Sequence, residues 1–455
     1  MNTKALRQKI LDLAIHGKLV PQDPNDEPAS VLLERIRAEK ERLIKEGKIK
    51  RPKKTKTTSD KPHYPYLLPE GWVWCKLEDI ATFGGGKTPS MDVKEYWNKG
   101  KNLWVTSKDM KNDSIHDSLM KITDEALNIM TQYEKDTLLV VTRSGILRHT
   151  LPIAILEKNA TINQDIKSIM PLNGIIPKFL FYAIKANENI ILTEYHKDGT
   201  TVDSIDFDKF KCLPIPLPPI NEQKRIITEV LKVSASIDCI DCGKADLYTA
   251  IAQAKSKILN LAIHGKLVPQ DPTDEPASEL LKRINPKAEI TCDNGHYQKL
   301  PEEWVITPMQ TLCALVDGEK QNGIERINLE VKYLRGEREA KVLTSGKYTA
   351  ANTLLILVDG ENSGEVFRAP VDGYQGSTFK QLSIHEEMYT DYVLQVINLH
   401  RKTLRENKVG SAIPHLNKKL FKAINVPIPP YEEQKRIVNA INQTFTILDK
   451  IMENL

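Results

Sequence analysis

The chain has 455 residues, of which 40% are hydrophobic and 27% are charged, and its formal net charge is +4. This length predicts two or three domains, and the composition is typical of a soluble globular protein. No apolar run approaches the ~18 residues that a membrane-spanning helix needs. The net charge is too small to indicate a nucleic-acid partner by itself.

The N-terminal segment, residues 1–67, is predicted to form a helix followed by a basic linker. It has neither the apolar core nor the cleavage site of a signal peptide, so we expect the protein in the cytoplasm. The six scattered cysteines agree with the reduced thiols of that compartment. Residues 35–61 contain twelve Lys/Arg against four acids. This charge indicates a solvated linker or, as a second interpretation, an arm that lies near phosphates.

Two globular domains are predicted, one over residues 68–218 and the other over residues 300–429. Both contain short β-rich runs separated by Gly, Asp, Asn and Ser. The first domain includes NLWVTS and TLLVVTRSG, and the second includes TLLILVDGENSGEV and STFKQLSIH. The fold class that we expect is α+β, with two mixed α/β domains joined by long helices.

A long helix is predicted between the two domains, within the central segment of residues 219–299. From position 221 to position 264 there is no proline and one glycine, Gly243. Apolar residues alternate at spacings of four and three, and only Lys244 breaks the series. This 3.5-residue repeat is typical of a helix that packs along a partner helix. At ~1.5 Å per residue its length is roughly 66 Å, and Gly265 followed by VPQDP ends it.

An internal repeat runs through the whole chain. Residues 13–30 recur as residues 261–278, and the one difference is Asn25 against Thr273. The motif LPEGW recurs as LPEEW after 232 residues, and PPINEQKRII recurs as PPYEEQKRIV after 211 residues. Each copy therefore consists of a short helix, a linker, a globular segment and a long helix. The helical parts are nearly identical while the globular parts diverge, which indicates a fixed frame with two different recognition surfaces.

The apolar series of the central helix continues into both ends of the chain. An offset of 211 residues places it on the C-terminal helix, residues 430–455, where Leu455 matches Lys244. An offset of 248 residues places it on the N-terminal helix, where Met1 matches Thr249. We expect the central helix to pack antiparallel against these two helices placed end to end, in a pseudo-two-fold arrangement. The alternative is a tandem duplication with unrelated packing.

These sequences closely resemble the specificity subunits of type I restriction–modification systems, over essentially the whole chain. The resemblance rests on the paired P-P-x-x-E-Q-K-R-I motifs, on the repeated LAIHGKLVPQDP segment and on LPEGWVWCKLEDIATFGGGKTPSMDVKEYWNKGKNLWVTSKDM at 68–110. It implies two target-recognition domains, each of which reads one half of a split DNA sequence. It also implies that two antiparallel helical regions set the distance between them, which suits a DNA turn of about 34 Å.

The resemblance further implies the partners. Two methyltransferase subunits would dock on the helical frame, including the GKLVPQDP-x-DEPAS segments, and two restriction/translocase subunits would join them for cleavage of double-stranded DNA. The chain itself would be a non-catalytic subunit that directs adenine methylation and holds no cofactor. S-adenosylmethionine, ATP and Mg²⁺ are expected on the partner subunits.

Two other classes of function remain as alternatives. The first is an enzyme, because ATFGGGKT at 81–88 matches a relaxed P-loop. However, Ala81 replaces the first glycine, Pro89 follows where a helix is needed, and the second copy has LVDGEKQNG. A stand-alone methyltransferase is disfavoured because IPPY at 428–431 has Ile428 where the catalytic motif needs Asn or Asp. The second alternative is a scaffold that binds partner subunits without contacting DNA.

Several single residues receive structural interpretations. Cys239 and Cys242 form a lone C-x-x-C inside a helical pattern, so we interpret them as helix positions and not as a metal or redox site. His16 and its repeat equivalent at position 264 stand at helix ends, where a side chain caps the last carbonyls. Trp72 and Trp304 are assigned to the core of each domain.

Candidate DNA contacts are polar loop residues at matched places in the two domains. Arg suits guanine and Asn or Gln suits adenine in the major groove. By resemblance, the G-x-T-P-S loop belongs to the recognition domain, and its polar residues are included. The candidates of the first domain are Lys87, Thr88, Ser90, Lys108, Arg143, Ser144, Arg148, Asn163, Gln164, Lys197, Thr200 and Thr201. The candidates of the second domain are Lys320, Gln321, Arg335, Arg338, Asn362, Ser363, Ser377, Lys380, Gln381, Ser411 and His415.

Overall fold

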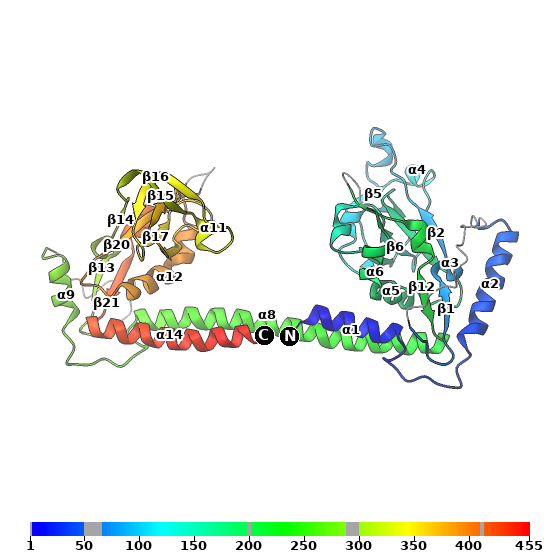
Figure 1. Ribbon diagram of the computed structural model, residues 1–455, viewed down its shortest axis with the longest axis horizontal. Coiled ribbons are helices and arrows are strands. Elements are labelled where there is room, and N and C mark those ends of the chain that lie inside the picture. The colour runs from blue at the N-terminus through cyan, green and yellow to red at the C-terminus, as the bar shows by residue number, and fades with distance from the viewer. Residues whose placement is uncertain (1, 50–65, 198–201, 288–299, 410–413) are drawn as a thin grey trace. The chain divides into compact units, whose positions relative to one another are not determined.

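The computed structural model describes residues 2–49, 66–197, 202–287, 300–409 and 414–455. Its contacts group into two compact units, unit 1 (Met1–Cys242) and unit 2 (Gly243–Leu455), which Figure 1 shows. Both units combine helices with β-sheets, so the predicted α+β class is confirmed. Among the described helices, none is both long enough and apolar enough to cross a membrane.

The predicted long helix is α8 (Ile220–Ile263), which continues for 44 residues. In unit 1 its first half packs on α1 (Thr3–Ile15), and Arg7 of α1 pairs with Asp238 at 2.6 Å and Asp241 at 3.1 Å. Further along the chain, Gln22 bonds to Glu222, near the start of α8. From residue 7 to residue 22 the residue number increases, while that of the partners on α8 decreases from 238 and 241 to 222. The predicted antiparallel packing is therefore confirmed in unit 1.

In unit 2 the second half of α8 packs on α14 (Tyr431–Glu453) in the same antiparallel sense. Lys255 pairs with Asp449 at 2.5 Å, and Lys244 donates a hydrogen bond to the Leu455 carbonyl. The residue that interrupts the apolar series thus satisfies a carbonyl at the end of the chain. The predicted end-to-end placement of the two terminal helices concerns both units together and stays a prediction.

The described globular part of unit 1 contains four small sheets, one of which is the strand pair β10–β11. A five-stranded sheet has the order β2-β9-β6-β7-β4, a three-stranded sheet has the order β5-β3-β8, and β1 pairs with β12. The strands are β1 (Val73–Lys76), β2 (Ala81–Gly85), β3 (Asn102–Val105), β4 (Ser114–Ile115), β5 (Met120–Ile122), β6 (Leu138–Val141), β7 (Ile153–Leu156), β8 (Ala160–Ile162), β9 (Ile166–Pro171), β10 (His196–Lys197), β11 (Ser204–Ile205) and β12 (Pro214–Leu217). The helices are α3 (Leu77–Ile80), α4 (Asp124–Leu127), α5 (Pro177–Ala186), α6 (Glu188–Glu194) and α7 (Phe207–Lys211).

The globular part of unit 2 has a different sheet topology. A four-stranded sheet has the order β14-β20-β17-β18, β15, β16 and β19 close into a small barrel, and β13 pairs with β21. The strands are β13 (Val305–Pro308), β14 (Cys313–Val316), β15 (Lys320–Leu329), β16 (Val342–Thr349), β17 (Leu354–Leu357), β18 (Val366–Arg368), β19 (Gly373–Gln375), β20 (Phe379–Ile384) and β21 (Asn425–Ile428). The helices are α9 (Ala277–Ile284), α10 (Met309–Leu312), α11 (Val331–Leu334), α12 (Thr390–Glu406) and α13 (Lys418–Ala423).

The segment that we interpreted as a basic linker or arm contains a packed helix, so that interpretation is wrong for its first part. Helix α2 (Ala29–Lys45) buries Leu32, Leu33 and Ile36 in the core of unit 1. These three residues form one apolar stripe on the helix, which the count of charges concealed. Residues 50–65 of the predicted linker lie outside the described residues. The other domain boundaries predicted from the sequence stay a prediction.

At the base of unit 1, a buried glutamate joins the long helix to the globular part. Glu222 of α8 accepts hydrogen bonds from Trp72 Nε1 (2.9 Å) and Gln22 Nε2 (3.0 Å), and burial raises the pKa of this carboxyl. Beside it, Arg225 pairs with Asp26 at 2.7 Å, and this bond lowers the pKa of Asp26. We call these five residues clasp 1. Glu222 and Arg225 come from the recurring E-Q-K-R motif, Gln22 and Asp26 from the recurring P-Q-D-P-x-D segment, and Trp72 from the L-P-E-G-W motif.

The base of unit 2 repeats this arrangement. Glu433 of α14 accepts hydrogen bonds from Trp304 Nε1 (3.0 Å) and Gln270 Nε2 (2.7 Å), and burial raises the pKa of this carboxyl. Arg436 pairs with Asp274 at 2.5 Å. We call these five residues clasp 2. Both clasp tryptophans are buried, so their predicted assignment to the cores is confirmed.

The two histidines of the repeated segment also keep equivalent places. His16 Nδ1 lies 2.6 Å from the Asp12 carbonyl, and His264 Nδ1 lies 2.7 Å from the Asn260 carbonyl. Each ring therefore satisfies a carbonyl in the last turn of its helix, as predicted. Gly265 has a φ of +65°, which suits the predicted helix end.

Candidate nucleic-acid interface

Several predicted DNA-contact residues of unit 1 lie in loops that hydrogen bonds connect. The Lys87 amide donates to the Ile162 carbonyl (3.1 Å), and Thr88 Oγ1 bonds to Gln164 Oε1 (2.5 Å). Next to these, the Asn163 side chain accepts a hydrogen bond from the Asp165 amide (3.2 Å). Lys87, Thr88 and Gln164 are exposed, whereas Asn163 is buried. The first three therefore offer side chains to a ligand, and Asn163 shapes the loop.

Asp203 holds a second group of these loops together. The Ser144 amide donates to its carbonyl (3.0 Å), and Arg148 Nε donates to its carboxylate (2.6 Å). Asp203 is only 2% exposed, while Arg143 and Arg148 are exposed. Sequence reasoning missed this carboxylate because it lies 55 residues from Arg148 in the chain. Its effect is to orient one of the two arginines, while the Arg143 side chain faces solvent.

Lys197 is also held by a nearby acid. Its ammonium lies 2.9 Å from Asp206, whose pKa it lowers by hydrogen bonding. Ser90 is exposed and accepts a hydrogen bond at its carbonyl from Trp97 Nε1 (3.0 Å). Thr200 and Thr201 lie outside the described residues.

Lys108 lines a hollow of about 500 Å³ together with Lys111, Ser144 and Ile146. An adjoining pocket of about 490 Å³ shares Lys185 with this hollow and reaches α1. These two hollows form a groove on unit 1 with several lysines along it. Asp113 and Glu188 also line these hollows, so the positive charge of the lysines is partly compensated.

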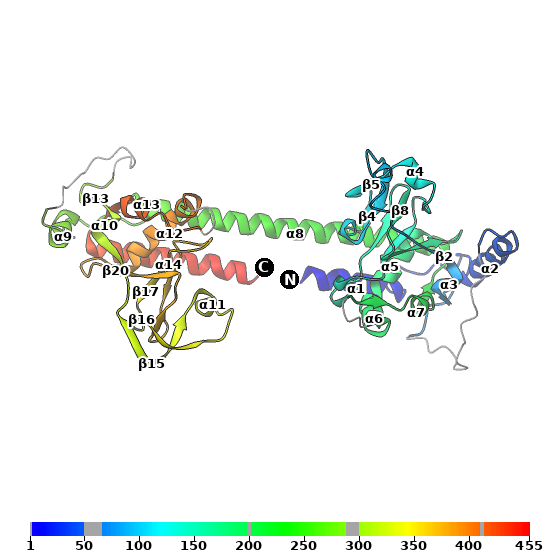
Figure 2. The ribbon, with the colours of Figure 1, turned by 90° about the horizontal axis from the view of Figure 1, so that it is seen from above.

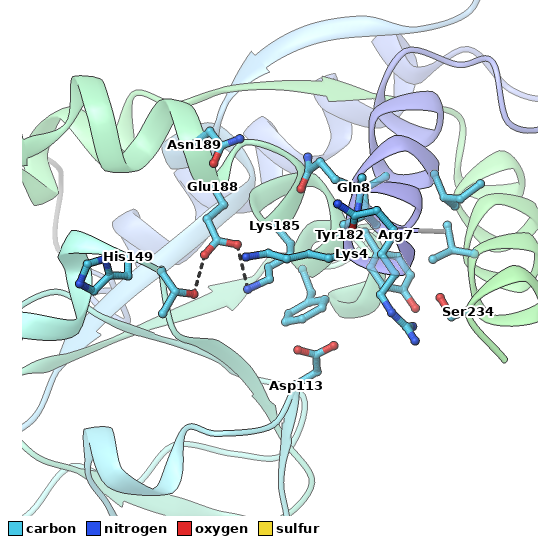
Figure 3. Close-up of a pocket in the computed structure, with 17 residues that line it drawn as sticks. Lys4, Arg7, Gln8, Asp113, His149, Tyr182, Lys185, Glu188, Asn189 and Ser234 are labelled. Carbon is cyan, nitrogen blue, oxygen red and sulfur yellow. Dashed lines mark hydrogen bonds and ion pairs between the residues drawn. The ribbon is translucent and has the colours of Figure 1, made fainter. Parts of the chain in front are cut away.

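Figure 3 shows the second of these pockets, which Glu188 lines. Burial raises the pKa of Glu188, but hydrogen bonds from the Leu151 amide (2.7 Å), the Thr150 hydroxyl (2.7 Å) and Lys185 (3.0 Å) bring it below its ordinary value. A carboxylate that accepts so many bonds is a structural anchor and a poor general acid. Among the described residues, no group of three His, Cys, Asp or Glu could hold a metal ion.

Asp317 organises one group of candidate residues in unit 2. It pairs with Lys380 at 2.5 Å and Lys347 at 2.8 Å, and these bonds hold its pKa well below the ordinary range. Gln381 donates to the Tyr348 carbonyl (2.7 Å) and therefore faces the protein. Of the predicted contacts in this group, Lys380 and Gln381 make internal bonds in this structure.

The neighbouring predicted contacts begin strand β15. Lys320 is exposed at its first position. The side-chain oxygen of Gln321 is buried and has no hydrogen-bond partner among the described residues. Ser377 is exposed in the turn before β20. Lys320 and Ser377 therefore remain available to a ligand.

Other candidates of unit 2 pair with local acids. Arg335 forms an ion pair with Glu365, and Arg338 lies 3.3 Å from Glu330. His415 Nδ1 lies 2.6 Å from Asp359 Oδ1. The structure therefore places these residues in separate groups, and their charge is partly compensated within the unit.

Two more candidates of unit 2 lie in the loop before β18. Ser363 is fully buried, and its hydroxyl lacks a partner in the described part of the chain, whereas Asn362 is half-buried. Ser411 lies outside the described residues. Sequence reasoning missed the exposed residues 342–345 of β16, although their β-branched and polar composition was visible.

The geometry removes the basis of both enzymatic alternatives. The P-loop match begins as strand β2, and no helix follows its glycines. A Cβ on Gly86 would lie 2.1 Å from the Ile162 carbonyl oxygen, so this backbone already packs against protein. Ile428 is fully buried within β21, which is unlike a residue that binds a target base. Cys239 and Cys242 lie within α8, as predicted.

Comparison with known proteins identifies a family for most of the chain. A family described as the type I restriction modification DNA specificity domain matches residues 69–241 and 301–455. The type I restriction enzyme EcoEI specificity subunit of Escherichia coli is 29% identical over 342 residues, which cover 65% of this chain and 57% of that protein. The EcoAI specificity subunit of the same species is 30% identical over 342 residues, with the same coverage. The chain therefore spans less than two thirds of the length of these relatives.

A solved chain supports the same fold. It comes from a structure that concerns complex assembly and conformational transition of the type I R-M system. It aligns with a TM-score of 0.54 at 16% identity, over 86% of this chain and 94% of that one. The two segments that match the family each contain the globular segment of one repeat copy and the helix that follows it.

Proposed function

The chain belongs to the type I restriction modification DNA specificity family, and we propose that it is the sequence-specific DNA-binding subunit of a type I restriction–modification complex. In this proposal it recognises a bipartite, asymmetric double-stranded DNA sequence. It then directs partner subunits to adenine methylation and DNA cleavage. The relatives named as specificity subunits support this assignment.

The observation that carries the proposal is the contrast between clasps and sheets. Clasp 1 and clasp 2 repeat the same glutamate, tryptophan, glutamine, arginine and aspartate contacts. The sheets of the two units differ in strand number and order. Two different sheets, each held by the same clasp contacts, suit an asymmetric sequence of two half-sites, because each half-site presents different base edges.

We assign the chemistry to partner subunits. The chain would be non-catalytic and would hold no cofactor, while two methyltransferase subunits and two restriction/translocase subunits carry S-adenosylmethionine, ATP and Mg²⁺. The helix pairs α1–α8 and α8–α14 would supply the docking frame. A partner that is cellular DNA implies that the protein works in the cytoplasm.

The test is a map of N6-methyladenine across the genome of the host, with and without this gene. We expect a split motif whose methylation disappears on deletion. An unchanged map, in a strain where the chain co-purifies with active methyltransferase subunits, contradicts the proposal. If the assembled complex methylates DNA without sequence preference, the chain is instead a scaffold.

A further inference from the structure

Strands β15 and β16 form an exposed two-stranded ribbon in unit 2, which Figure 2 shows standing out from the rest of the unit. Its antiparallel register pairs Lys320 with Lys347 and ends with Ile327 opposite Val342. Positions 322–325 of β15 and 342–345 of β16 are all exposed. Because successive strand residues point to opposite faces, side chains on both faces of the ribbon reach solvent there.

The exposed side chains of the ribbon mix apolar groups with amide and hydroxyl groups and one carboxylate, Glu325. Val342 is 59% exposed and Ile324 is 47% exposed, and Asn322, Thr344 and Ser345 stand beside them. A bare apolar strand pair invites unwanted pairing with other chains unless a partner covers it. Base edges in the major groove match this mixture, because Asn bonds adenine, Ser or Thr bonds several bases, and apolar groups contact the thymine methyl.

The ribbon is held rigidly from beneath. Between Asn322 and Arg326 the register of β15 against β16 shifts, as at a β-bulge. The hydroxyl of Tyr374, a buried residue, donates to the Ile324 carbonyl in this bulge (2.7 Å). On the opposite strand, a Cβ on Gly346 would lie 2.7 Å from Tyr374 Cγ. A bulge fixed in this way presents its side chains in one geometry, as specific recognition requires.

Positive charge brackets the exposed part of the ribbon. Lys320 stands at one end of the strand pair and Lys341 at the other, and both are exposed. Arg326 lies over the Tyr348 ring at 4.5 Å, with Asp372 at 3.7 Å. Cations on either side of a polar and apolar centre complement a groove whose walls are phosphates.

We propose that the β15–β16 ribbon enters the DNA major groove at the half-site of unit 2. Asn322, Thr344 and Ser345 contact base edges there, while Lys320 and Lys341 contact phosphates on the two sides. A major groove about 12 Å wide admits a two-stranded ribbon. This inference rests on the proposed function, because it assumes that unit 2 reads DNA.

The test uses the full chain assembled with its methyltransferase subunits. For Asn322→Ala, we expect discrimination at one base position of one half-site to fall about tenfold to one-hundredfold, because one specific base contact is lost. The other half-site keeps its sequence. The readout is sequencing of the sites that the complex methylates in a random DNA library. The matched control is Asn407→Ala, an exposed asparagine at the end of α12 in the same unit, which leaves both half-sites unchanged.

A second variant separates phosphate contact from base contact. Lys320→Ala should weaken binding to all sequences about equally and reduce the slope of log K against log salt by about 0.9, the value for one phosphate contact. An unchanged slope contradicts the role of Lys320.

Three outcomes separate the ribbon proposal from the proposed function. If Asn322→Ala leaves discrimination unchanged in a complex that still methylates a bipartite site, the ribbon proposal is wrong and the proposed function stands. If Leu343→Ser abolishes co-purification with the methyltransferase subunits, the ribbon is a protein-docking surface and the proposal is also wrong. If the unsubstituted complex methylates no bipartite site, the proposed function fails and the ribbon proposal fails with it.

Discussion

Unit 1 and unit 2 agree at their clasps and disagree in their sheets. Each clasp buries a glutamate against a tryptophan indole at 2.9–3.0 Å, and each adds an arginine–aspartate pair at 2.5–2.7 Å. Above the clasps, unit 1 has a five-stranded sheet and a three-stranded sheet, while unit 2 has a four-stranded sheet and a small barrel. The difference teaches that one repeat combines the same clasp contacts with two different sheet topologies.

The largest expected effects come from the clasp tryptophans. Trp72→Ala should destabilise unit 1 by about 3–5 kcal/mol, since a buried aromatic ring is lost and a cavity remains. Trp304→Ala should do the same to unit 2. Urea denaturation followed by hydrogen exchange of the strand pairs β1–β12 and β13–β21 measures each loss separately. A loss of unfolding free energy below about 1 kcal/mol in one unit would contradict the view that the two clasps stabilise their units equally.

Gly17→Ala and Gly265→Ala, at the ends of the two equivalent helices, should reduce stability by less than the tryptophan variants do. Gly17 and Gly265 have φ values of +64° and +65°, and a Cβ on either would lie 2.4 Å from a proline ring, Pro69 or Pro301. Left-handed strain alone costs about 1–2 kcal/mol for alanine. The control is Gly47→Ala, where φ is +70° and no atom lies within 4 Å. We expect both helix-end variants to lose more stability than the control in thermal melts, and equal losses would show that the proline contact is unimportant.

Two acids of clasp 1 should respond to pH with opposite signs. Burial raises the pKa of Glu222, so its contribution to stability is fully present below its unfolded pKa and is lost as pH rises through its folded pKa. The bond from Arg225 lowers the pKa of Asp26, so its contribution is present above its unfolded pKa and is lost as pH falls through its folded pKa. The contribution of Glu222 to stability therefore decreases as pH rises above about 4.3, and that of Asp26 decreases as pH falls below about 3.9.

The measurement is the free energy of unfolding of Glu222→Gln and Asp26→Asn from pH 3 to pH 7. Relative to the unsubstituted protein, Glu222→Gln should gain stability as pH rises. Asp26→Asn should lose relative stability over the same change. Parallel curves for the two variants would contradict the assignment of raised and lowered pKa values within one clasp.

The ion pairs along the helices should have the smallest effects. Lys255→Ala removes a pair with Asp449 that is partly exposed, so we expect a loss below about 1 kcal/mol. Arg7→Ala, which loses two exposed pairs in unit 1, should be similar and should shrink at high salt. Chemical denaturation at low and high salt checks both. A loss of stability comparable with that of the tryptophan variants would show that the ion pairs along the helices stabilise each unit as much as the clasps do.

Much of the frame could be predicted from the sequence because its signals are local. The apolar spacing of α8, the histidine at each helix end and the break at VPQDP involve neighbours within one or two turns. Helix α2 was missed because its apolar stripe, which includes Leu32 and Ile36, stands beside a dense run of charges.

The surroundings of the candidate DNA-contact residues were less predictable, because their partners are distant in the chain. Arg148 is held by Asp203, and Arg335 is held by Glu365. No spacing rule connects residues that far apart in the chain. The arginines could therefore be identified from the sequence, but the acids that pair with them could not. The exposed part of β16 was missed for a related reason, because its pairing with β15 and the bond from Tyr374 to Ile324 join residues that are distant in the chain.

Exchange of residues 68–218 for the same segment of another family member tests the central claim most directly. The measurement is the genome-wide N6-methyladenine motif of cells that express the exchanged chain with its methyltransferase subunits. The account predicts that one half of the split motif changes while the other half keeps its sequence. A change in both halves, from a complex that still assembles, would contradict the view that each unit reads its own half-site on a common frame.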